Sequence, residues 1–257
     1  MSLIFEVTSG VALLRLNRPE VLNSFNKEMA LALQSALDEC AKRDDIRAVL
    51  LTGEGRAFSA GQDLAEAVAT DGPALQSIVR DHYNPIILKI RNLMKPVVCA
   101  VNGVAAGAGA NIALSCDIVF AAESASFIQA FSKIGLIPDS GGTYFLPRLI
   151  GMQRASALMM LGDKIGSAQA LQMGMIYKVC ADDQLAEITG KCAADLAKAP
   201  TKGLGYTKQA LNNSMRATLE EQLEMEEQLQ TLAGKTHDYN EGVNAFLGKR
   251  KPEFKGN

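Results

Sequence analysis

The sequence predicts an α/β fold with largely parallel sheets, and apolar runs that alternate with helical segments carry that prediction. The runs Ile46–Gly53, Val97–Gly103 and Asp117–Ala122 contain little polar alternation. Such runs are typical of strands buried on both faces of a parallel sheet. Because helical patterns lie between them, the order along the chain favours an α/β architecture over separate sheet and helix domains.

The remaining elements follow in order. Residues 3–17 alternate and break at Ser9-Gly10, which predicts a β-hairpin. Residues 27–43 have the periodicity of an amphipathic helix. Residues 64–95 are expected to be mostly helical. The apolar stripe of the first helix comprises Met29, Leu31, Leu33, Ala36, Leu37 and Cys40.

Strand patterns stop after about residue 198, and residues 201–247 are typical of helices alone. We therefore expect a core over 1–198 that carries the site, and a helical region over 199–257. The apolar faces of that region favour a role in oligomerisation.

The composition and net charge of the chain argue against several classes of function. The chain has 257 residues, 48% hydrophobic and 21% charged, and a net charge of −2. That charge argues against general nucleic-acid binding. No apolar run approaches the roughly 18 residues of a membrane helix, and the N-terminus lacks the features of a signal peptide, so a cytoplasmic protein without membrane contact is expected.

The cysteines and histidines indicate no metal site. The five cysteines show no C-x-x-C spacing, which predicts buried free thiols in a reducing compartment. The two histidines, His82 and His237, lie in unrelated contexts, so no zinc site is expected.

The most unusual stretch is Gly103–Ala110, in which every residue but Val104 is glycine or alanine. It follows a predicted strand and opens a predicted helix, as in dinucleotide-binding folds. However, Ile112 stands where the third small residue belongs, and no acidic residue follows at the required distance. A nicotinamide cofactor is therefore not expected.

Small residues at this place suit two further purposes. Close packing of a helix on a strand needs them, and so does close approach of a ligand to backbone N–H groups. The glycine-containing loop Ala57–Asp63 offers a second source of N–H groups, and two donors from two loops make an oxyanion hole. The pattern alone favours neither purpose.

A second local motif, Asp139-Ser140-Gly141-Gly142, is similar to the nucleophile motif of chymotrypsin-like serine proteases. Those enzymes are all-β, whereas this chain is α/β, so a serine hydrolase is not expected. By position, Asp139 suits two roles, as an N-cap for a helix that starts near Gly141 or as a catalytic acid.

Four longer segments resemble the crotonase, or enoyl-CoA hydratase/isomerase, superfamily. They are LNRPEVLNSF (16–25), AFSAGQDL (57–64), AVNGVAAGAGANIALSCDI (100–118) and GLIPDSGGTYFLPRLIG (135–151). The resemblance extends over the whole chain. It implies a crotonase-like spiral of repeated ββα units with a helical C-terminal region, an acyl-CoA thioester substrate, no separate cofactor, and a homotrimer or a dimer of trimers.

The resemblance also implies roles for residues. The backbone N–H groups of Gln62 and Ala108 match the oxyanion donors, and Asp139 matches a catalytic carboxylate of several isomerases. A neighbouring subunit is expected to contribute Phe246 and Lys249 to the site. The basic C-terminal tail that contains Lys249 suits contact with a CoA phosphate. The other residues that match CoA-contacting and substrate-contacting segments are Arg18, Val21, Leu22, Ala60, Asp63 and Leu64.

The departures from the family pattern set the expected reaction. The two glutamates of the hydratases are replaced by Asn111 and by Phe131, and these two residues, with Tyr83, are expected in the substrate pocket. Adding water needs a base and an acid, whereas a proton shift between two carbons needs one carboxylate. We therefore expect an isomerase that acts through a thioester enolate on a 3-enoyl-CoA or a related ring, with burial raising the pKa of Asp139.

Three alternatives stand beside this interpretation. A hydratase with displaced carboxylates predicts incorporation of water. An aromatic-CoA dehalogenase needs a histidine to activate water, and His82, its one candidate, is expected on a helix surface. A non-catalytic acyl-CoA-binding or RNA-binding crotonase is the third, and its RNA-binding form needs a lysine-rich helix that residues 27–43 do not supply.

Overall fold

The computed structural model describes all residues, 1–257. A six-stranded sheet in the order β1-β2-β3-β5-β7-β10 forms its centre. The first pair is the predicted antiparallel hairpin, and the other neighbours are parallel. The strands are β1 (Leu3–Thr8), β2 (Val11–Leu16), β3 (Ala48–Gly53), β5 (Val97–Val101), β7 (Ile118–Ala122) and β10 (Lys178–Cys180).

A second sheet of four short strands accompanies the first, in the order β4-β6-β8-β9. Three times in succession along the chain, a strand of the large sheet is followed at once by a strand of the small one. This alternation is the repeated unit of a crotonase-like spiral and confirms the predicted fold class. The small strands are β4 (Ala57–Ser59), β6 (Val104–Ala106), β8 (Ser126–Ile128) and β9 (Lys164–Gly166).

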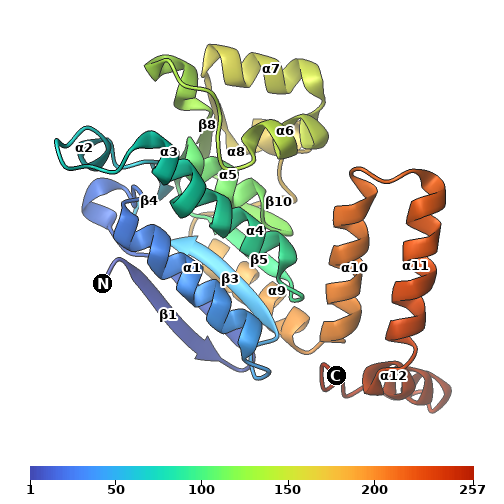
Figure 1. The fold of residues 1–257 in the computed structure, drawn as a ribbon. Coiled ribbons are helices and arrows are strands. Elements are labelled where there is room, and N and C mark those ends of the chain that lie inside the picture. The colour runs from blue at the N-terminus through green and yellow to red at the C-terminus, as the bar shows by residue number, and fades with distance from the viewer.

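The helices of the core pack around these sheets (Figure 1). The predicted first helix is α1, which begins after Asn26, whose side chain accepts a hydrogen bond from the Met29 N–H at 2.9 Å. Its apolar stripe is buried except for Leu31, which is 43% exposed because it points away from the core. The helices are α1 (Lys27–Lys42), α2 (Leu64–Ala67), α3 (Leu75–Ser77), α4 (Asn84–Asn92), α5 (Ala108–Leu114), α6 (Gly142–Ile150), α7 (Met152–Leu161), α8 (Ser167–Gln172) and α9 (Leu185–Ala197).

The segment 64–95 is helical in pieces rather than continuously. A π-helix, η2 (Ile78–Tyr83), joins α3 to α4, and short 3-10 helices lie at η1 (Pro19–Val21) and η3 (Ala130–Ile134). π-Helical turns are rare and often lie at functional sites. Here the turn carries Tyr83 inward, where its side chain is buried.

The chain after residue 198 is helical, as predicted, with α10 (Thr201–Ser214), α11 (Leu219–Ala233) and α12 (His237–Leu247). These helices stand beside the core at one end (Figure 1). Lys208 of α10 joins them to the core, because its ammonium lies 2.7 Å from Asp117 and donates to the Lys95 carbonyl. Burial lowers the pKa of Lys208, and Asp117 opposes that effect.

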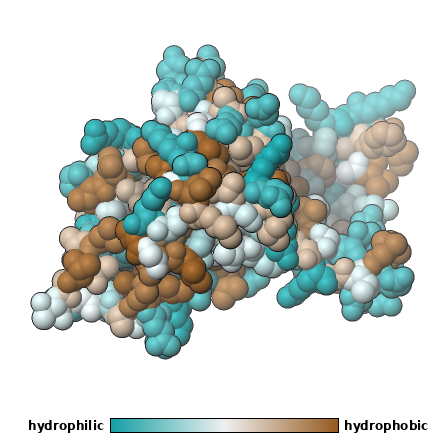
Figure 2. Space-filling view, turned by 90° about the horizontal axis from the view of Figure 1, so that it is seen from above, coloured by the Kyte–Doolittle hydropathy of each residue, from teal (hydrophilic) through white to brown (hydrophobic).

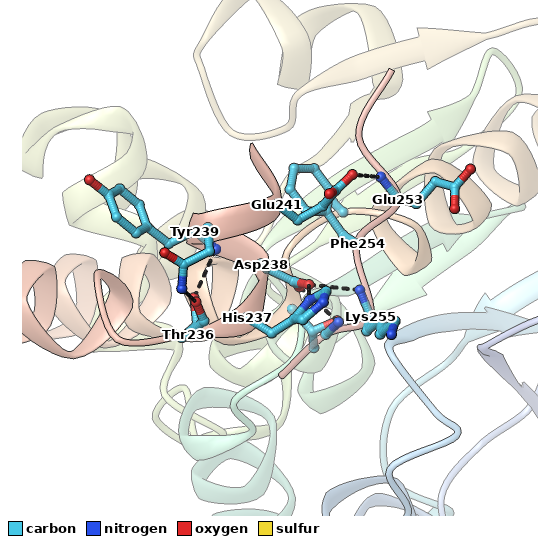
Figure 3. A network of polar contacts seen from close by, with 12 residues as sticks. Thr236, His237, Asp238, Tyr239, Glu241, Glu253, Phe254 and Lys255 are labelled. Carbon is cyan, nitrogen blue, oxygen red and sulfur yellow. Dashed lines mark hydrogen bonds and ion pairs between the residues drawn. The ribbon is translucent and has the colours of Figure 1, made fainter. Parts of the chain in front are cut away.

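The C-terminal tail folds back onto α12 (Figure 3). The buried carboxylate of Asp238 accepts hydrogen bonds from the backbone N–H groups of Lys255 and Gly256, each at 2.7 Å. Glu241 holds Arg250 and the Glu253 N–H in the same way. The tail is therefore an ordered part of the helical region.

The thiols agree with their prediction. All five cysteines are free, and Cys40, Cys99, Cys116 and Cys180 are buried while Cys192 is half-buried. No helix is both long and apolar enough to cross a membrane.

Candidate active site

A cavity of about 220 Å³ lies where the ends of β4 and β6 meet α5, η2 and η3. Its lining is mostly apolar, with Asp139 the one carboxylate. Apolar pockets with few polar groups are the usual form of small-molecule sites. The lining residues are Ala60, Gly61, Gln62, Leu64, Ala67, Leu75, Ile78, Tyr83, Gly107, Ala108, Ala130, Phe131, Lys133, Ile134, Leu136 and Asp139.

Two backbone amides of the lining have no acceptor within the chain. The N–H of Ala108 is the first of α5, a position without an intrahelical partner, and the N–H of Gln62 follows the glycine of the other loop. Gly61 has a φ of +92°, and a Cβ there would lie 2.8 Å from the Ala106 carbonyl oxygen and 3.5 Å from the Ala108 nitrogen. The glycine thus brings the two loops together and leaves the Ala108 amide uncovered.

The small residues of Gly103–Ala110 serve both close packing and ligand access in this structure. A Cβ on Gly109 would lie 2.6 Å from the Cβ of Ser59, and one on Gly103 would lie 2.2 Å from the Arg56 carbonyl oxygen, so these glycines serve close packing. Gly107 has a φ of +51° and lines the cavity in front of α5, so it serves access to the amide. The run of small residues looks uniform in the sequence, but Gly103 and Gly109 serve packing whereas Gly107 serves access to the cavity.

Asp139 faces the same cavity from the turn before α6. Burial raises the pKa of its carboxyl group, and a hydrogen bond at 2.9 Å from the Ser140 hydroxyl to its Oδ1 partly opposes that rise. The N-cap of α6 is Gly141, with no side-chain cap, so the alternative of Asp139 as an N-cap is wrong. A partly buried carboxylate with a raised pKa, in the same cavity as two free N–H donors, is a candidate for proton transfer.

Tyr83, which was expected in the substrate pocket, lines this cavity, and its phenol donates a hydrogen bond at 2.7 Å to the Gln62 side-chain carbonyl. Burial raises the pKa of Tyr83 well above its ordinary value, and Asp139 adds to the rise. The phenol therefore stays protonated and holds the side chain of the residue whose backbone N–H is free.

Phe131 and Asn111, which occupy the positions of the two hydratase glutamates, lie in different surroundings. Phe131 lines the cavity with its ring near Gly107, as predicted. Asn111 was expected beside it but lies behind the wall, 1% exposed and outside the lining. The reason is that both ends of its amide are bonded inside the protein, to the Asp139 carbonyl at 2.9 Å and to Gln129 at 2.8 Å.

The residues expected to contact CoA fall into three groups. Ala60 and Leu64 line the cavity. Arg18 and Asp63 pair with each other at 2.9 Å, and Asp63 also caps α2, so both have partners within the chain. The two remaining residues, Val21 and Leu22, belong to the turn at η1, where Leu22 has a φ of +54°.

Phe246 and Lys249 do not reach the cavity of their own chain. Phe246 is 83% exposed on α12, which lies at the far end of the molecule from α2 and α3 (Figure 1).

His82 was expected on a helix surface and is instead buried, 5% exposed, because η2 turns it inward. It is not among the cavity residues.

Sequence reasoning missed the outer part of the wall. Leu75, Ile78 and Ile134 line the cavity although no motif marks them, and Leu136 lines it although nothing within its motif singles it out. Several are exposed at its mouth, and Figure 2 shows apolar residues gathered in patches on the core. The sequence offered one signal for these residues. They are aliphatic side chains in short helical segments that have no continuous apolar face, so they are left exposed.

The paired sheets and the amide-lined cavity place the protein in the class to which the motifs pointed. A model of the enoyl-CoA hydratase/isomerase family matches residues 6–257, so the chain belongs to that family. Its members act on acyl-CoA thioesters.

Individual relatives carry names for different reactions. The chain is 51% identical over 257 residues to the "1,2-epoxyphenylacetyl-CoA isomerase" of Escherichia coli K12, covering 99% of this chain and 98% of that one. It is 43% identical over 252 residues to a protein of Rhodobacter capsulatus named "Probable enoyl-CoA hydratase", covering 98% and 97%. The solved enoyl-CoA hydratase of Bacillus anthracis superposes with a TM-score of 0.93 at 32% identity, with all of both chains covered.

Proposed function

We propose that the protein is an acyl-CoA isomerase that moves a proton through a thioester enolate. One observation carries the proposal: the cavity holds a single carboxylate, Asp139, with a raised pKa, beside two free backbone N–H groups. The amides of Gln62 and Ala108 take the enolate oxygen, and Asp139 takes the proton. No metal or redox cofactor enters this chemistry, since CoA arrives as part of the substrate.

The proton balance needs only this one group. Asp139 removes a proton from the carbon next to an activated double bond or from the carbon alpha to the thioester, and the electron pair moves onto the thioester oxygen. The enolate collapses as Asp139 returns the proton at a different carbon. Nothing is gained or lost, so the product is an isomer.

We infer two substrates for the same proton shift, a 3-enoyl-CoA that becomes a 2-enoyl-CoA and 1,2-epoxyphenylacetyl-CoA that becomes the seven-membered oxepin-CoA. In the second substrate the C1–C2 bond shared by the ring and the epoxide breaks as the ring double bonds shift, and Asp139 moves the proton from the carbon alpha to the thioester to a ring carbon. The relative from Escherichia coli supports the ring substrate. The mostly apolar wall, with Phe131 in it, suits a ring or a short chain. The place of the reaction in phenylacetate or fatty acid catabolism depends on which substrate is faster.

The test is a parallel assay in deuterated water with a 3-enoyl-CoA, a 2-enoyl-CoA and 1,2-epoxyphenylacetyl-CoA, read by mass spectrometry. An isomerase rearranges the first and third without the mass gain of added water. A 3-hydroxyacyl-CoA from the second would overturn the proposal.

The second candidate is enoyl-CoA hydration, favoured by the name of the Rhodobacter relative. Against it, both hydratase carboxylates are absent, and Asn111 is bonded where it stands. The dehalogenase alternative loses support because His82 lies outside the cavity lining. A non-catalytic binding protein would not need a carboxylate with a raised pKa in the cavity.

We also propose that Phe246 and Lys249 serve the site of a neighbouring subunit in a homotrimer or a dimer of trimers. Exposed aliphatic residues on the C-terminal helices support assembly there, among them Leu219, Leu223, Leu232 and Leu247. Light scattering of the purified protein tests the assembly.

The free thiols support a reducing cytoplasmic location, which fractionation of cells tests.

A further inference from the structure

Asn111 joins two parts of the candidate site that come from separate elements. Its Nδ2 donates a hydrogen bond at 2.9 Å to the backbone carbonyl of Asp139, and its Oδ1 accepts one at 2.8 Å from Gln129. Asn111 belongs to α5, three residues after Ala108. Three residues of α-helix rise roughly 4.5 Å, so the residue that holds the Asp139 turn shares one helical turn with a free amide.

The turn that Asn111 holds is strained. Ser140 has a φ of +50° and Gly141 one of +74°, and Ser140 is a non-glycine residue in the left-handed region. Such conformations persist where the surroundings hold them in place. Besides Asn111, only the Gly142 N–H bonds the Asp139 carbonyl, at 2.8 Å.

The structure leaves room for this contact. A Cβ on Gly142 would lie 2.4 Å from the Asn111 Nδ2, closer than real atoms approach. Glycine at 142 therefore allows α6 to begin directly against the Asn111 amide. The contact also requires an amide, because one end donates and the other accepts, and an ionised carboxylate only accepts.

We propose that Asn111 is a positioning residue that sets the Asp139 carboxylate at a fixed place relative to the Ala108 amide. This inference rests on the proposed function. Asn111 lies outside the cavity lining, so it acts through the backbone of Asp139. Misplacing a catalytic group by about 1 Å is enough to cost on the order of a hundredfold in rate.

The main test is Asn111→Leu, which keeps the number and branching of the side-chain heavy atoms, removes both hydrogen-bonding groups and adds no charge. We expect kcat to fall by on the order of ten- to a hundredfold, with KM within about threefold, since the residue holds the base and not the CoA ester. We also expect the acid limb of the kcat–pH profile to move to lower pH. The released carboxyl group gains solvent, and its pKa falls toward that of an ordinary aspartate.

A second variant separates positioning from folding. Asn111→Leu leaves Gln129 without its partner, so it is expected to lose stability as well. Adding Gln129→Leu removes that unpaired group, and replacing both partners of a buried hydrogen bond by apolar groups is often nearly neutral. We expect the double variant to regain its melting temperature while kcat stays low. Recovery of both together would overturn the proposal.

The matched control is Ser115→Ala at the other end of α5. It removes one buried hydrogen bond, from the Ser115 hydroxyl to the Ile112 carbonyl at 2.7 Å. We expect kcat and its pH profile to be unchanged. An equal loss of kcat in this control and in Asn111→Leu would mean that any damage to α5 slows the enzyme, and would count against a specific role.

A measurement without substrate keeps this inference apart from the proposed function. Carbon-13 NMR of labelled aspartate carboxyls, with Asp139→Asn for assignment, gives the Asp139 titration in the free protein. A lower midpoint in Asn111→Leu supports positioning even if the isomerase assay fails, and an unmoved midpoint overturns it even if that assay succeeds.

Discussion

At the scale of single residues, the candidate chemistry depends on one carboxyl group whose surroundings oppose its charge. Burial raises the pKa of Asp139, while the Ser140 hydroxyl bonds its Oδ1 and favours the ionised form. Burial is the larger of the two effects, so the pKa of the carboxyl group lies above its ordinary value, which favours its use as a proton carrier.

The first prediction concerns activity. Asp139→Asn should abolish isomerisation because an amide does not accept the substrate proton, and it should leave acyl-CoA affinity within a few-fold because the amides of Gln62 and Ala108 remain. Steady-state rates and calorimetric titration with a non-reactive acyl-CoA measure the two effects. Retained turnover would rule out the assigned role.

The second prediction concerns stability. Because the folded-state pKa of Asp139 is raised, its contribution to stability is complete below the unfolded pKa of about 3.9 and is lost as pH rises through the folded value. Asp139→Asn removes this loss, so the variant should melt at a higher temperature than the parent at pH 7 and at the same temperature below pH 4. The exposed Asp71→Asn serves as the control. A lower melting temperature at pH 7 would contradict this account.

At the scale of elements, the first residue of α5 lines the cavity, and the side chain of Asn111 contacts the Asp139 turn from outside the lining. The first N–H of α5 is free, and Gly109 lets the helix lie against Ser59 of β4. A change at the first residue of this helix therefore acts on the site through the backbone.

The third prediction uses that backbone amide. Ala108→Pro deletes the N–H at the first helical position, where proline is otherwise well tolerated. Turnover should fall by on the order of a hundredfold or more, as for other lost oxyanion donors. Met152→Pro is the matched control, since Met152 is also the first residue of a helix, α7, follows a glycine and is exposed. Equal losses in both variants would point to damaged folding, which circular dichroism would detect.

Elements were predictable from the sequence where one period dominated. The strand at Val97–Val101 and the helix from Lys27 have a single pattern, and both are present. The π-helix over Ile78–Tyr83 has no sequence periodicity of its own. The inward position of Tyr83 was expected from the family resemblance, whereas the burial of His82 was not predicted. The motifs indicated the cavity, but the bridge made by Asn111 depends on Gly142, which is distant in sequence, and no local period encodes such a contact.

At the scale of the whole molecule, the C-terminal region depends on a few buried polar contacts with its own tail and with the core. Arg47, in the core, donates to the carbonyls of Ala199 and Phe254 and to the Thr201 hydroxyl. Asp238 holds the last residues from the other side (Figure 3). The tail therefore links the helical region to the sheet.

The fourth prediction tests this link. Asp238→Ala leaves the amides of Lys255 and Gly256 without their acceptor, which should cost about 2 kcal/mol or more of unfolding free energy, because hydrogen bonds to charged groups contribute about 1.5–3 kcal/mol each. Carboxypeptidase should also trim the tail faster. Urea titration and mass spectrometry measure both, against the exposed Asp183→Ala as control. Unchanged trimming would show that the tail is held by other contacts.

The cavity wall has two parts that differ in their freedom to change. In the inner part, a Cβ on Gly61 would collide with the Ala106 carbonyl oxygen, and Gly107 has a φ of +51° that strains any other residue. The outer part consists of short helical pieces whose aliphatic residues, such as Leu75 and Ile134, lie half in solvent. Substitutions at the outer part can reshape the space for the acyl group and leave the amides where they are. We therefore expect substrate range and the proposed enolate chemistry to be separable in this scaffold, with new acyl specificities best sought by varying α2, α3 and η3 alone.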